Sequence, residues 1–480
     1  MSDAQKSVGR GEGTAPGKYL HKLRLFVSQR RFLLGGLLLV LIAWFLVFLA
    51  TPPFETPDEN KNYAYVQSLA NGHLPRLPAA GEAGESELGI ELERSYWFGA
   101  IAFHEDRIVN SLRPPIDESK SDDVDTSMQA THEPLYFLTA SSFYRLARFA
   151  GFSAAKTYYA TRLASLGFFM VFIVAFWKVA KMMMDERAAQ YLTMAIALQP
   201  TLLMVATCVN ADIGVIALTT LTIGVLLAGL KAGSTRLSFA VLLGILTGAA
   251  FWAKFPGVIL IPVVMLSLAF SLKSETIQKV RLIGAYALST VAAMAPWLVI
   301  NLIRYHSLLN SNGGIAQRPE FDTNTTSIIL MPLNDVRQSL YTFAGSFGWL
   351  DAPVFLELRL IYPFAVAVLI VLAVWITIRR EKLQFRFDHI PFVSTLAVTS
   401  LMLFLIAFSL LMVLKYYWAY PLQGRYYLIG LLPAALLFFS GLKQILRSLP
   451  DESIARGVFL VSLIFFLINI IFTLLPRFYV

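Results

Sequence analysis

Long apolar stretches separated by short polar segments run along most of the chain. A helix of about 20 residues crosses a hydrocarbon core of about 30 Å. Windows that satisfy this length lie near residues 32–50, 158–180, 188–207, 212–230, 237–253, 255–272, 282–302, 357–378, 391–414, 426–446 and 457–475. These eleven windows predict an all-α polytopic integral membrane protein.

The positive charges alternate between the loops that connect these windows. More than half of the 40 Lys and Arg residues lie in the N-terminal segment or in alternate short loops, which hold Lys178, Lys231, Lys279, Arg379 and Lys443, among others. Because basic loops remain in the cytoplasm, this alternation predicts a cytoplasmic N-terminus and an outer C-terminus. Phe48 and Leu49 end the first window where a cleavable signal requires small residues, so we expect the first span to be retained.

The windows and loops divide the chain into six segments. These are a basic cytoplasmic segment 1–31, a first span 32–50, a large outer loop 51–157, spans two to seven in 158–302, a second outer loop 303–356, and spans eight to eleven in 357–480. The large loop contains about half of the 31 acidic residues. Loops of this length are uncommon unless they serve a function.

The large outer loop begins with the pattern of a helix start. Thr56 is predicted as the N-cap, Pro57 as the first helical residue, and Glu59 as the third, which together form a capping box. Gly72 is a suitable stop, and an apolar stripe lies between them at Tyr63, Val66, Leu69 and Ala70. Asp58 and Glu59 therefore lie directly beyond the outer end of the first span.

A second helix is predicted later in the same loop. Glu133 precedes Pro134, which suits the first helical position, and Gly151 lies near the end. The segment is short for a span, and counting it as one would place the basic loops on the wrong side of the membrane. We therefore interpret it as an interfacial helix rich in aromatic residues. An aromatic membrane anchor without substrate contact is the alternative.

Composition excludes several classes of protein. Charged residues make up 15%, against about 25% in an ordinary globular domain, and mean hydropathy is +0.62. The net charge of +9 is explained by the cytoplasmic loops, so no nucleic-acid partner is expected. A single cysteine excludes an internal disulfide framework and a Cys-rich metal site. Four histidines outside the spans lack metal-site spacing and are interpreted as ordinary loop residues: His73, His104, His132 and His306.

Short motifs at the predicted outer ends of the helices resemble those of the type-C glycosyltransferase superfamily, in particular a bacterial branch with an early Pro-Asp-Glu and a late Gln-Gly-Arg-Tyr motif. The superfamily includes aminoarabinose lipid A transferases and protein O-mannosyltransferases. The resemblance rests on residues 56–60, 133–136, 199–200, 209–212, 248–257, 296–305, 345–350 and 423–427. One departure is Glu133, where relatives often have a neutral residue.

The resemblance implies a membrane enzyme of the bacterial cytoplasmic membrane with its active site on the extracytoplasmic face. It would transfer a sugar, with inversion, from a polyprenyl-phosphate donor to an envelope glycan, lipid or protein. The implied general base is Asp58 with Glu59 beside it, and the implied substrate-binding residues are Asn210, Asp212, Lys254, Arg304, Arg425 and Tyr426. No cofactor is implied with certainty, and no metal ligands are assigned, although a divalent metal remains open.

The chemistry agrees with this placement. Displacing a phosphate from an anomeric carbon requires a base for the acceptor hydroxyl and cations for the leaving group. The loop alternation puts the acids and the cations on one side at similar depth. Simpler roles exist for each: Glu59 completes a capping box, Asp212 lies beside the cap-like Asn210, and basic residues near helix ends extend to lipid headgroups. We therefore favour Asp58 over Glu59 as the reactive carboxylate.

Three other functions compete with this prediction. A transporter or lipid flippase would place ionisable residues near the middle of the bilayer, whereas these acids lie at its outer margin. A polysaccharide polymerase or ligase also has a large outer loop, but we expect it to use Arg and His rather than an early acidic pair. An assembly factor would use the long loop for binding without catalysis.

Overall fold

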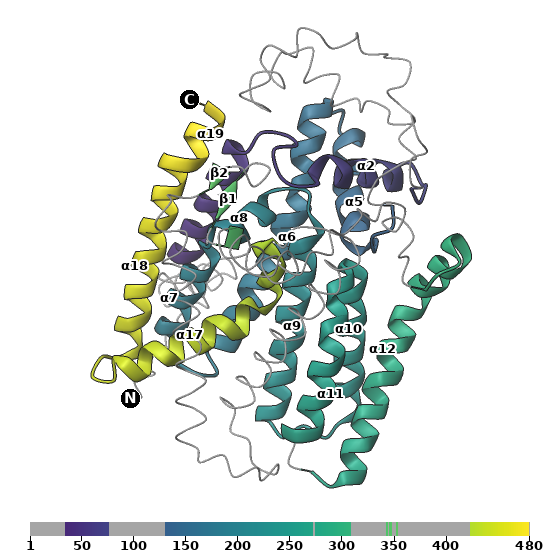
Figure 1. The fold of residues 1–480 in the computed structure, drawn as a ribbon, viewed down its shortest axis with the longest axis vertical. Helices are drawn as coiled ribbons and strands as arrows, with labels where there is room; N and C mark the ends of the chain where they lie inside the picture. The colour runs from purple at the N-terminus through teal and green to yellow at the C-terminus, as the bar shows by residue number, and fades with distance from the viewer. Residues whose placement is uncertain are drawn as a thin grey trace, which may run out of the picture.

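The computed structural model describes residues 34–75, 130–271, 274–308, 342–343, 345–347, 352–353 and 423–479. Its described part is helical except for one short antiparallel pair, β1 (Ser346–Phe347) with β2 (Ala352–Pro353). Most of the helices run along the long axis of the molecule (Figure 1). The predicted spans at 357–378 and 391–414, the basic segment 1–31 and most of the second outer loop lie outside the described residues.

Five helices are long and apolar enough to cross a membrane. They are α6 (Ala154–Ala180), α9 (Ala211–Lys231), α12 (Thr276–Tyr305), the helix Gly424–Ile445 made of η4 (Gly424–Gly430) and α17 (Leu431–Ile445), and the helix Asp451–Phe478 made of α18 (Asp451–Asn469), η5 (Ile470–Leu474) and α19 (Leu475–Tyr479). Shorter apolar helices are Leu34–Ala50, α10 (Leu237–Ala253), and η3 (Phe255–Ile259) with α11 (Leu260–Ser271). The prediction of an all-α polytopic membrane protein is confirmed, while the total of eleven spans remains a prediction.

One predicted span is broken. The window 188–207 consists of α7 (Glu186–Ala197) and α8 (Pro200–Thr207), which meet at an angle of 68°. Pro200 has no backbone N–H and disfavours helical geometry in the preceding residue, so the helix stops there. Gln199 starts α8 by accepting a hydrogen bond from the backbone N–H of Leu202, and its amide donates to the carbonyl of Phe343.

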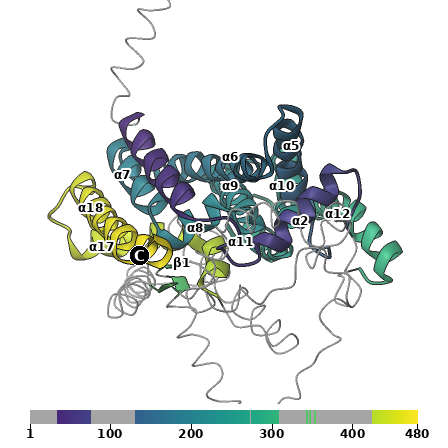
Figure 2. The same cartoon turned by 90° about the horizontal axis from the view of Figure 1, so that it is seen from above.

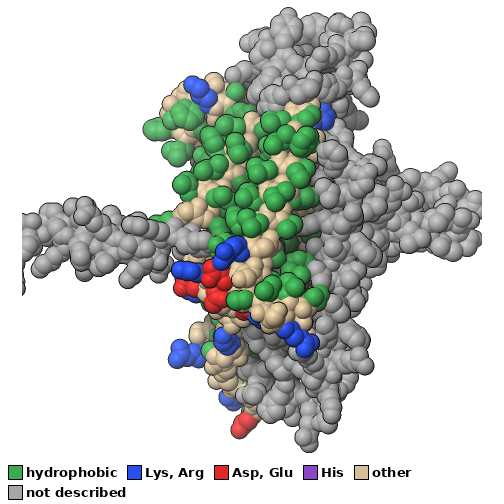
Figure 3. Space-filling model, turned by 90° about the vertical axis from the view of Figure 1, so that its left-hand side faces the viewer, with side chains coloured by type: hydrophobic (Ala, Val, Ile, Leu, Met, Phe, Trp, Pro, Cys, Tyr) green, Lys and Arg blue, Asp and Glu red, His purple; other side chains and the backbone are tan. Residues whose placement is uncertain are grey.

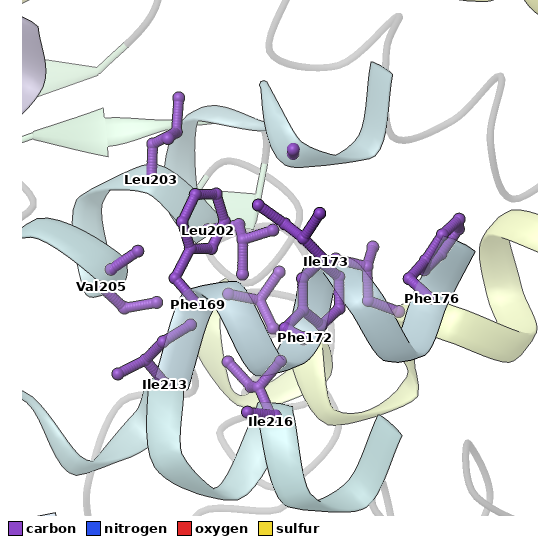
Figure 4. Close-up of a cluster of buried hydrophobic side chains, with 14 of the residues drawn as sticks. Phe169, Phe172, Ile173, Phe176, Leu202, Leu203, Val205, Ile213 and Ile216 are labelled. Atoms are coloured by element: carbon purple, nitrogen blue, oxygen red, sulfur yellow. The ribbon is translucent and has the colours of Figure 1, made fainter. Parts of the chain in front are cut away.

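The helices α6 and α9 lie in the middle of the bundle, with α17 and α18 on one side and α12 on the other (Figure 2). The core packs aromatic side chains of α6 against aliphatic side chains of α8 and α9 (Figure 4), among them Phe169, Phe172, Ile173, Phe176, Leu202, Leu203, Val205, Ile213 and Ile216. This packing fixes the N-terminus of α9 beside α6.

Close backbone approach joins α10 to α12. A Cβ added to Gly248 would collide with the Cβ of Ala293, and one added to Gly244 would collide with the hydroxyl of Ser289. The two glycines are four residues apart and lie on one face of α10, which is the small-residue spacing that lets membrane helices pack closely. This contact holds the C-terminal half of α10, the helix that Lys254 follows.

An apolar band covers the side of the molecule formed by α18 (Figure 3). Exposed side chains on this helix include Val461 and Ile464, as expected for a surface that faces lipid. Figure 3 also shows a group of charged side chains below this band. Arg187, at the start of α7, pairs with Glu452, at the start of α18, at 3.8 Å. The first turns of α7 and α18 therefore lie at the same end of the bundle.

Two helices of the large outer loop pack on each other. They are α2 (Glu59–Ala70), which crosses the end of the bundle, and α5 (Leu135–Phe149) (Figure 1). Gly72 follows α2 with a φ of 90°, which confirms the predicted stop. Arg145 of α5 donates to the carbonyls of Leu69 and Ala70, and so provides hydrogen bonds for backbone carbonyls at the C-terminal end of α2. Their interfacial position in a membrane stays a prediction.

The predicted helix starts are displaced. α2 begins at Glu59 rather than at Pro57, because Asp58 has a φ of 66° and cannot belong to a right-handed helix. The backbone N–H of Glu59 instead closes a turn on the carbonyl of Thr56 at 3.2 Å. The predicted capping box is therefore wrong, although the Thr56 hydroxyl does donate to the Glu59 carboxylate. Pro134 likewise lies one residue before α5 rather than inside it.

Candidate active site

Four charged side chains from distant parts of the chain meet at one point. Arg425 Nη2 donates to Asp58 Oδ2 at 2.7 Å, and Arg425 Nε lies 3.6 Å from Asp212 Oδ2. Lys254 Nζ donates to Asp212 Oδ1 at 2.5 Å. We call this set, made of Asp58, Asp212, Lys254 and Arg425, the charged cluster. It contains two acids and two cations, so the charges of the four side chains cancel.

Asp58 is the most accessible member of the charged cluster, with 32% of its side chain exposed. Asp58 follows Pro57 in a β-turn. It occupies the third position of this turn, where a positive φ is required and Gly or Asn is usual. Burial raises the pKa of its carboxyl, but the charge and hydrogen bond of Arg425 outweigh it, with help from Lys254 and Lys61, and the net pKa is lowered. Asp58 is therefore an ionised carboxylate in a strained turn, a combination frequent at functional sites.

Asp212 occupies the first turn of α9. Asn210 is the N-cap of that helix, and its side-chain oxygen accepts a hydrogen bond from the Asp212 N–H at 2.8 Å. The Asn210 N–H donates in turn to the hydroxyl of Tyr136 at 3.0 Å. Asn210 is thus placed beside the charged cluster, but its side-chain oxygen is used to cap the helix. Asp212 is buried and is held between both cations of the charged cluster.

The two cations lie at breaks between helical segments. Lys254 is the extended residue between α10 and η3, and Arg425 lies in η4 after Gly424. The ring of Tyr426 is shared by both, with Lys254 Nζ at 5.8 Å and Arg425 Cζ at 5.4 Å from its centroid. The negative face of an aromatic ring attracts cations at this range. Tyr426 therefore helps to hold the two positive groups together.

Glu59 lies behind the charged cluster in a separate buried pair. Both of its carboxylate oxygens accept from Arg162 at 2.9 Å, and neither residue has any exposed side-chain surface. Glu59 also accepts from the N–H of Val209 and the hydroxyl of Thr56, each at 2.8 Å. Every donor around this carboxylate is fixed in the protein. Glu59 thus joins α2, α6 and the start of α9.

Arg304 is not among the contacts of the charged cluster. Its guanidinium donates to the carbonyls of Leu74 and Pro75 at 3.2 and 3.0 Å and lies over the ring of Tyr305. These contacts hold the C-terminal end of α12 against the segment that follows α2. The structure therefore brings together Asp58, Asp212, Lys254, Arg425 and Tyr426, with Asn210 adjacent, and separates Glu59 and Arg304 from them.

Arg162 is the important residue that sequence reasoning missed. Besides Glu59, it donates to the carbonyls of Thr51 and Pro52 and to the hydroxyl of Tyr158. A signal existed, because Arg inside an apolar window is rare and nearly always has a partner. Arg162 therefore fastens the end of the first span and the turn that carries Asp58.

A second acid near Lys254 is Glu133, which is buried and accepts a hydrogen bond from the N–H of Phe255 at 2.8 Å. Burial raises its pKa to about 7, against the lowering effects of its hydrogen bonds and of Lys254. The adjacent His132 has its pKa lowered to about 4 by burial and by Lys254, so its imidazole is neutral at pH 7. Glu133 thus holds the chain directly after Lys254.

The charged cluster does not fit a divalent metal ion. Within the described ranges, no group of three or more His, Cys, Asp or Glu side chains is arranged to bind a metal. The two carboxylates of the charged cluster are those of Asp58 and Asp212, and both already face Arg425. A cation between them would be repelled by that guanidinium. No metal is therefore assigned to the charged cluster.

The fold and the site together define an all-helical, multi-pass membrane protein with a charged cluster at the helix ends. The chain belongs to the family described as predicted membrane protein (DUF2142), whose model matches residues 38–437. A comparison with curated proteins finds no match.

Among solved structures, the chain is similar to oligosaccharyltransferases of Archaeoglobus fulgidus. One, in complex with an inhibitory peptide and a dolichol-phosphate, matches at a TM-score of 0.45 and 11% identity, over 92% of this chain and 56% of that one. Another, in complex with Zn and sulfate, matches at 0.43 and 12%, over 89% and 52%. The chain thus spans about half the length of these enzymes.

Proposed function

We propose that this protein is a membrane glycosyltransferase that transfers a sugar from a polyprenyl-phosphate donor to an envelope glycan, lipid or protein on the extracytoplasmic face of a bacterial cytoplasmic membrane. The observation that supports this most directly is the charged cluster itself. It places a partly exposed carboxylate, Asp58, within 2.7 Å of a guanidinium, with the ammonium of Lys254 nearby. Inverting transfer from a phosphate needs a base and cations in this arrangement.

Asp58 is the proposed general base. Its carboxylate would take the proton of the acceptor hydroxyl while the acceptor oxygen forms its bond to the anomeric carbon. The bond between that carbon and the phosphate oxygen breaks on the opposite side, and the electron pair stays on the phosphate. Attack from the face opposite to the leaving group inverts the anomeric centre.

Lys254 and Arg425 are the proposed partners of the leaving phosphate. An Arg fork matches phosphate oxygens in pairs, and an ammonium adds a compact positive charge. Asp212 would hold both cations in place, with Asn210 fixing the position of Asp212 through the helix cap. Tyr426 would keep the cations together. For Glu59 we propose a structural role, and for Arg304 a role in holding the loop after α2.

A transfer assay tests this proposal. Purified protein in lipid nanodiscs would be incubated with a radiolabelled polyprenyl-phosphate sugar and an envelope extract as acceptor source. We expect label to move to acceptor in the wild type and not in Asp58→Asn. Absence of both transfer and donor hydrolysis with every polyprenyl-phosphate sugar tried would contradict an enzymatic role.

Cysteine labelling tests the orientation. Asn71 is exposed beyond α2, whereas the native Cys208 is buried and gives a low background. Asn71→Cys should react with a membrane-impermeant maleimide added to intact spheroplasts, and Ala232→Cys, exposed at the opposite helix ends between α9 and α10, should react only after lysis. Labelling of Ala232→Cys alone in intact spheroplasts would contradict an outer active site.

A further inference from the structure

Arg425 is almost completely buried, with only 3% of the residue exposed. Its Nη2 donates to Asp58 and its Nη1 donates to the carbonyl of Pro57 at 3.4 Å. Its Nε lies 3.6 Å from Asp212 and has no hydrogen-bond partner among the described residues. A phosphate that makes a paired contact through Nη2 therefore competes with the Asp58 carboxylate for this nitrogen.

Asp58 is the partner that is free to leave. Asp212 is buried and also bound to Lys254, and the carbonyl of Pro57 belongs to the backbone of the turn. The Asp58 side chain, by contrast, is about one third exposed, and its remaining ion pair, to Lys61, is at 4.0 Å. Its carboxylate can turn toward solvent and be hydrated there, while an incoming phosphate replaces it as the counter-charge of the buried Arg425.

From this geometry we propose that the donor phosphate displaces the Asp58 carboxylate from Arg425, so that the general base is released only when donor is bound. The inference rests on the proposed function and adds to it an order of events, with donor before acceptor. In the free protein the ion pair prevents Arg425 from binding phosphate through Nη2 and prevents Asp58 from acting as a base.

The charges favour this exchange. The charged cluster is neutral in the free protein, and a phosphate would add negative charge to it. When Asp58 moves away, the phosphate takes its place, so Nη2 of Arg425 still has one anionic partner. The released carboxylate loses the hydrogen bond from Arg425, and the bound phosphate adds negative charge to its surroundings. Both changes raise its pKa and make it a stronger base. The donor thereby activates the group that will deprotonate the acceptor.

Binding of polyprenyl phosphate in nanodiscs tests the exchange, with a polyprenol of the same length as the control ligand. Asp58→Asn removes the competing carboxylate, so we expect it to bind polyprenyl phosphate about tenfold more tightly than the wild type, although it cannot catalyse transfer. Asp58→Glu keeps the charge and should show no such gain. Equal or weaker binding by Asp58→Asn would overturn the exchange while leaving the proposed enzyme class intact.

A double-variant cycle separates direct competition from a general loss of negative charge. In an Arg425→Gln background the Asp58→Asn change should give no gain in phosphate affinity, because the contact is already absent. A tenfold gain that persists without Arg425 would overturn the proposal. Binding of polyprenyl phosphate no tighter than polyprenol by every variant would contradict the proposed donor, and the exchange with it.

Carbodiimide labelling of the wild type avoids dependence on a variant that fails to fold. Carbodiimides react with protonated carboxyl groups, so a released Asp58 with a higher pKa should be labelled faster. We expect polyprenyl phosphate to increase labelling at Asp58, measured by peptide mass spectrometry, and polyprenol to leave it unchanged. Decreased or unchanged labelling with saturating polyprenyl phosphate would overturn the exchange.

Discussion

Asp58 and Glu59 are adjacent in sequence but have opposite environments. Glu59 has no exposed side-chain surface and accepts hydrogen bonds from Arg162, Val209 and Thr56. Asp58 is about one third exposed and has one strong partner, Arg425. The left-handed turn at Asp58 separates them, because it directs one carboxylate into the bundle and leaves the other at its surface. Two acidic residues that are adjacent in the sequence therefore have different environments and partners in the folded protein.

The arginines that pair with the two acids differ in whether a ligand can reach them. Arg162 lies inside α6 among fixed protein acceptors, so its charge is already neutralised by groups that do not exchange. Arg425 lies in a short helical segment and contacts an acid that reaches solvent. A ligand can compete for the second pair but not for the first. We therefore propose a chemical role for the pair Asp58–Arg425 and a structural role for the pair Glu59–Arg162.

The difference between Asp58 and Glu59 is tested most strongly by a substitution of Asp58. Asp58→Asn should lower the transfer rate by about 100- to 10,000-fold, the range for loss of a general base, with little change in thermal stability. Transfer would be measured with labelled donor, and unfolding in detergent by intrinsic fluorescence. Asp451→Asn, at the opposite end of the bundle, is the matched control and should keep full activity. Full activity in Asp58→Asn would reject its role as base.

At Glu59 the expected effect is on folding. Glu59→Gln leaves Arg162 buried without its counter-charge, and breaking a buried pair in this way costs about 3–5 kcal/mol. The change should appear as a lower unfolding temperature and a lower yield of folded protein. A Glu59→Gln protein that is as stable as the wild type but inactive would show instead that Glu59 takes part in catalysis.

Lys254 gives a smaller expected effect, confined to donor binding. Lys254→Met removes one of the two proposed phosphate partners and should weaken binding of polyprenyl phosphate by about tenfold. Lys443→Met is the control, because Lys443 pairs with Asp451 far from the charged cluster. Donor affinity should be unchanged in the control. An unchanged affinity in Lys254→Met would remove Lys254 from the donor site.

Glu133 gives an effect of a different kind, a dependence of stability on pH. Its pKa is raised to about 7 in the folded protein, from an ordinary value near 4.5, mainly by burial. The folded state then binds more protons than the unfolded state, so the contribution of Glu133 to stability falls as pH rises from about 4.5 to about 7. The slope is at most about 1.4 kcal/mol per pH unit.

Glu133→Gln should flatten this part of the stability profile relative to the wild type. Unfolding temperatures of both proteins, measured in the same detergent across this pH range, give the difference directly. Parallel profiles would show that Glu133 does not change its protonation state on folding.

The amino-acid sequence by itself determined the helices and the chemical groups of the site. Apolar length is a local property, so the windows in the described part correspond to helices, and Gly72 marks a helix end because glycine readily adopts a positive φ. The motifs also named Asp58, Asp212, Lys254 and Arg425. Each of these residues follows a helix end or begins a helix, where sequence signals are strongest.

Only the tertiary structure decided which charges pair. Asp58 and Arg425 are 367 positions apart, and Glu59 and Arg162 are 103 apart, so no local pattern relates them. The structure also moved the start of α2 to Glu59 and placed Arg304 on the loop after α2. A charge near a helix end has many candidate partners, and its choice depends on how the whole bundle packs. Packing thus separated the structural acid from the proposed catalytic one.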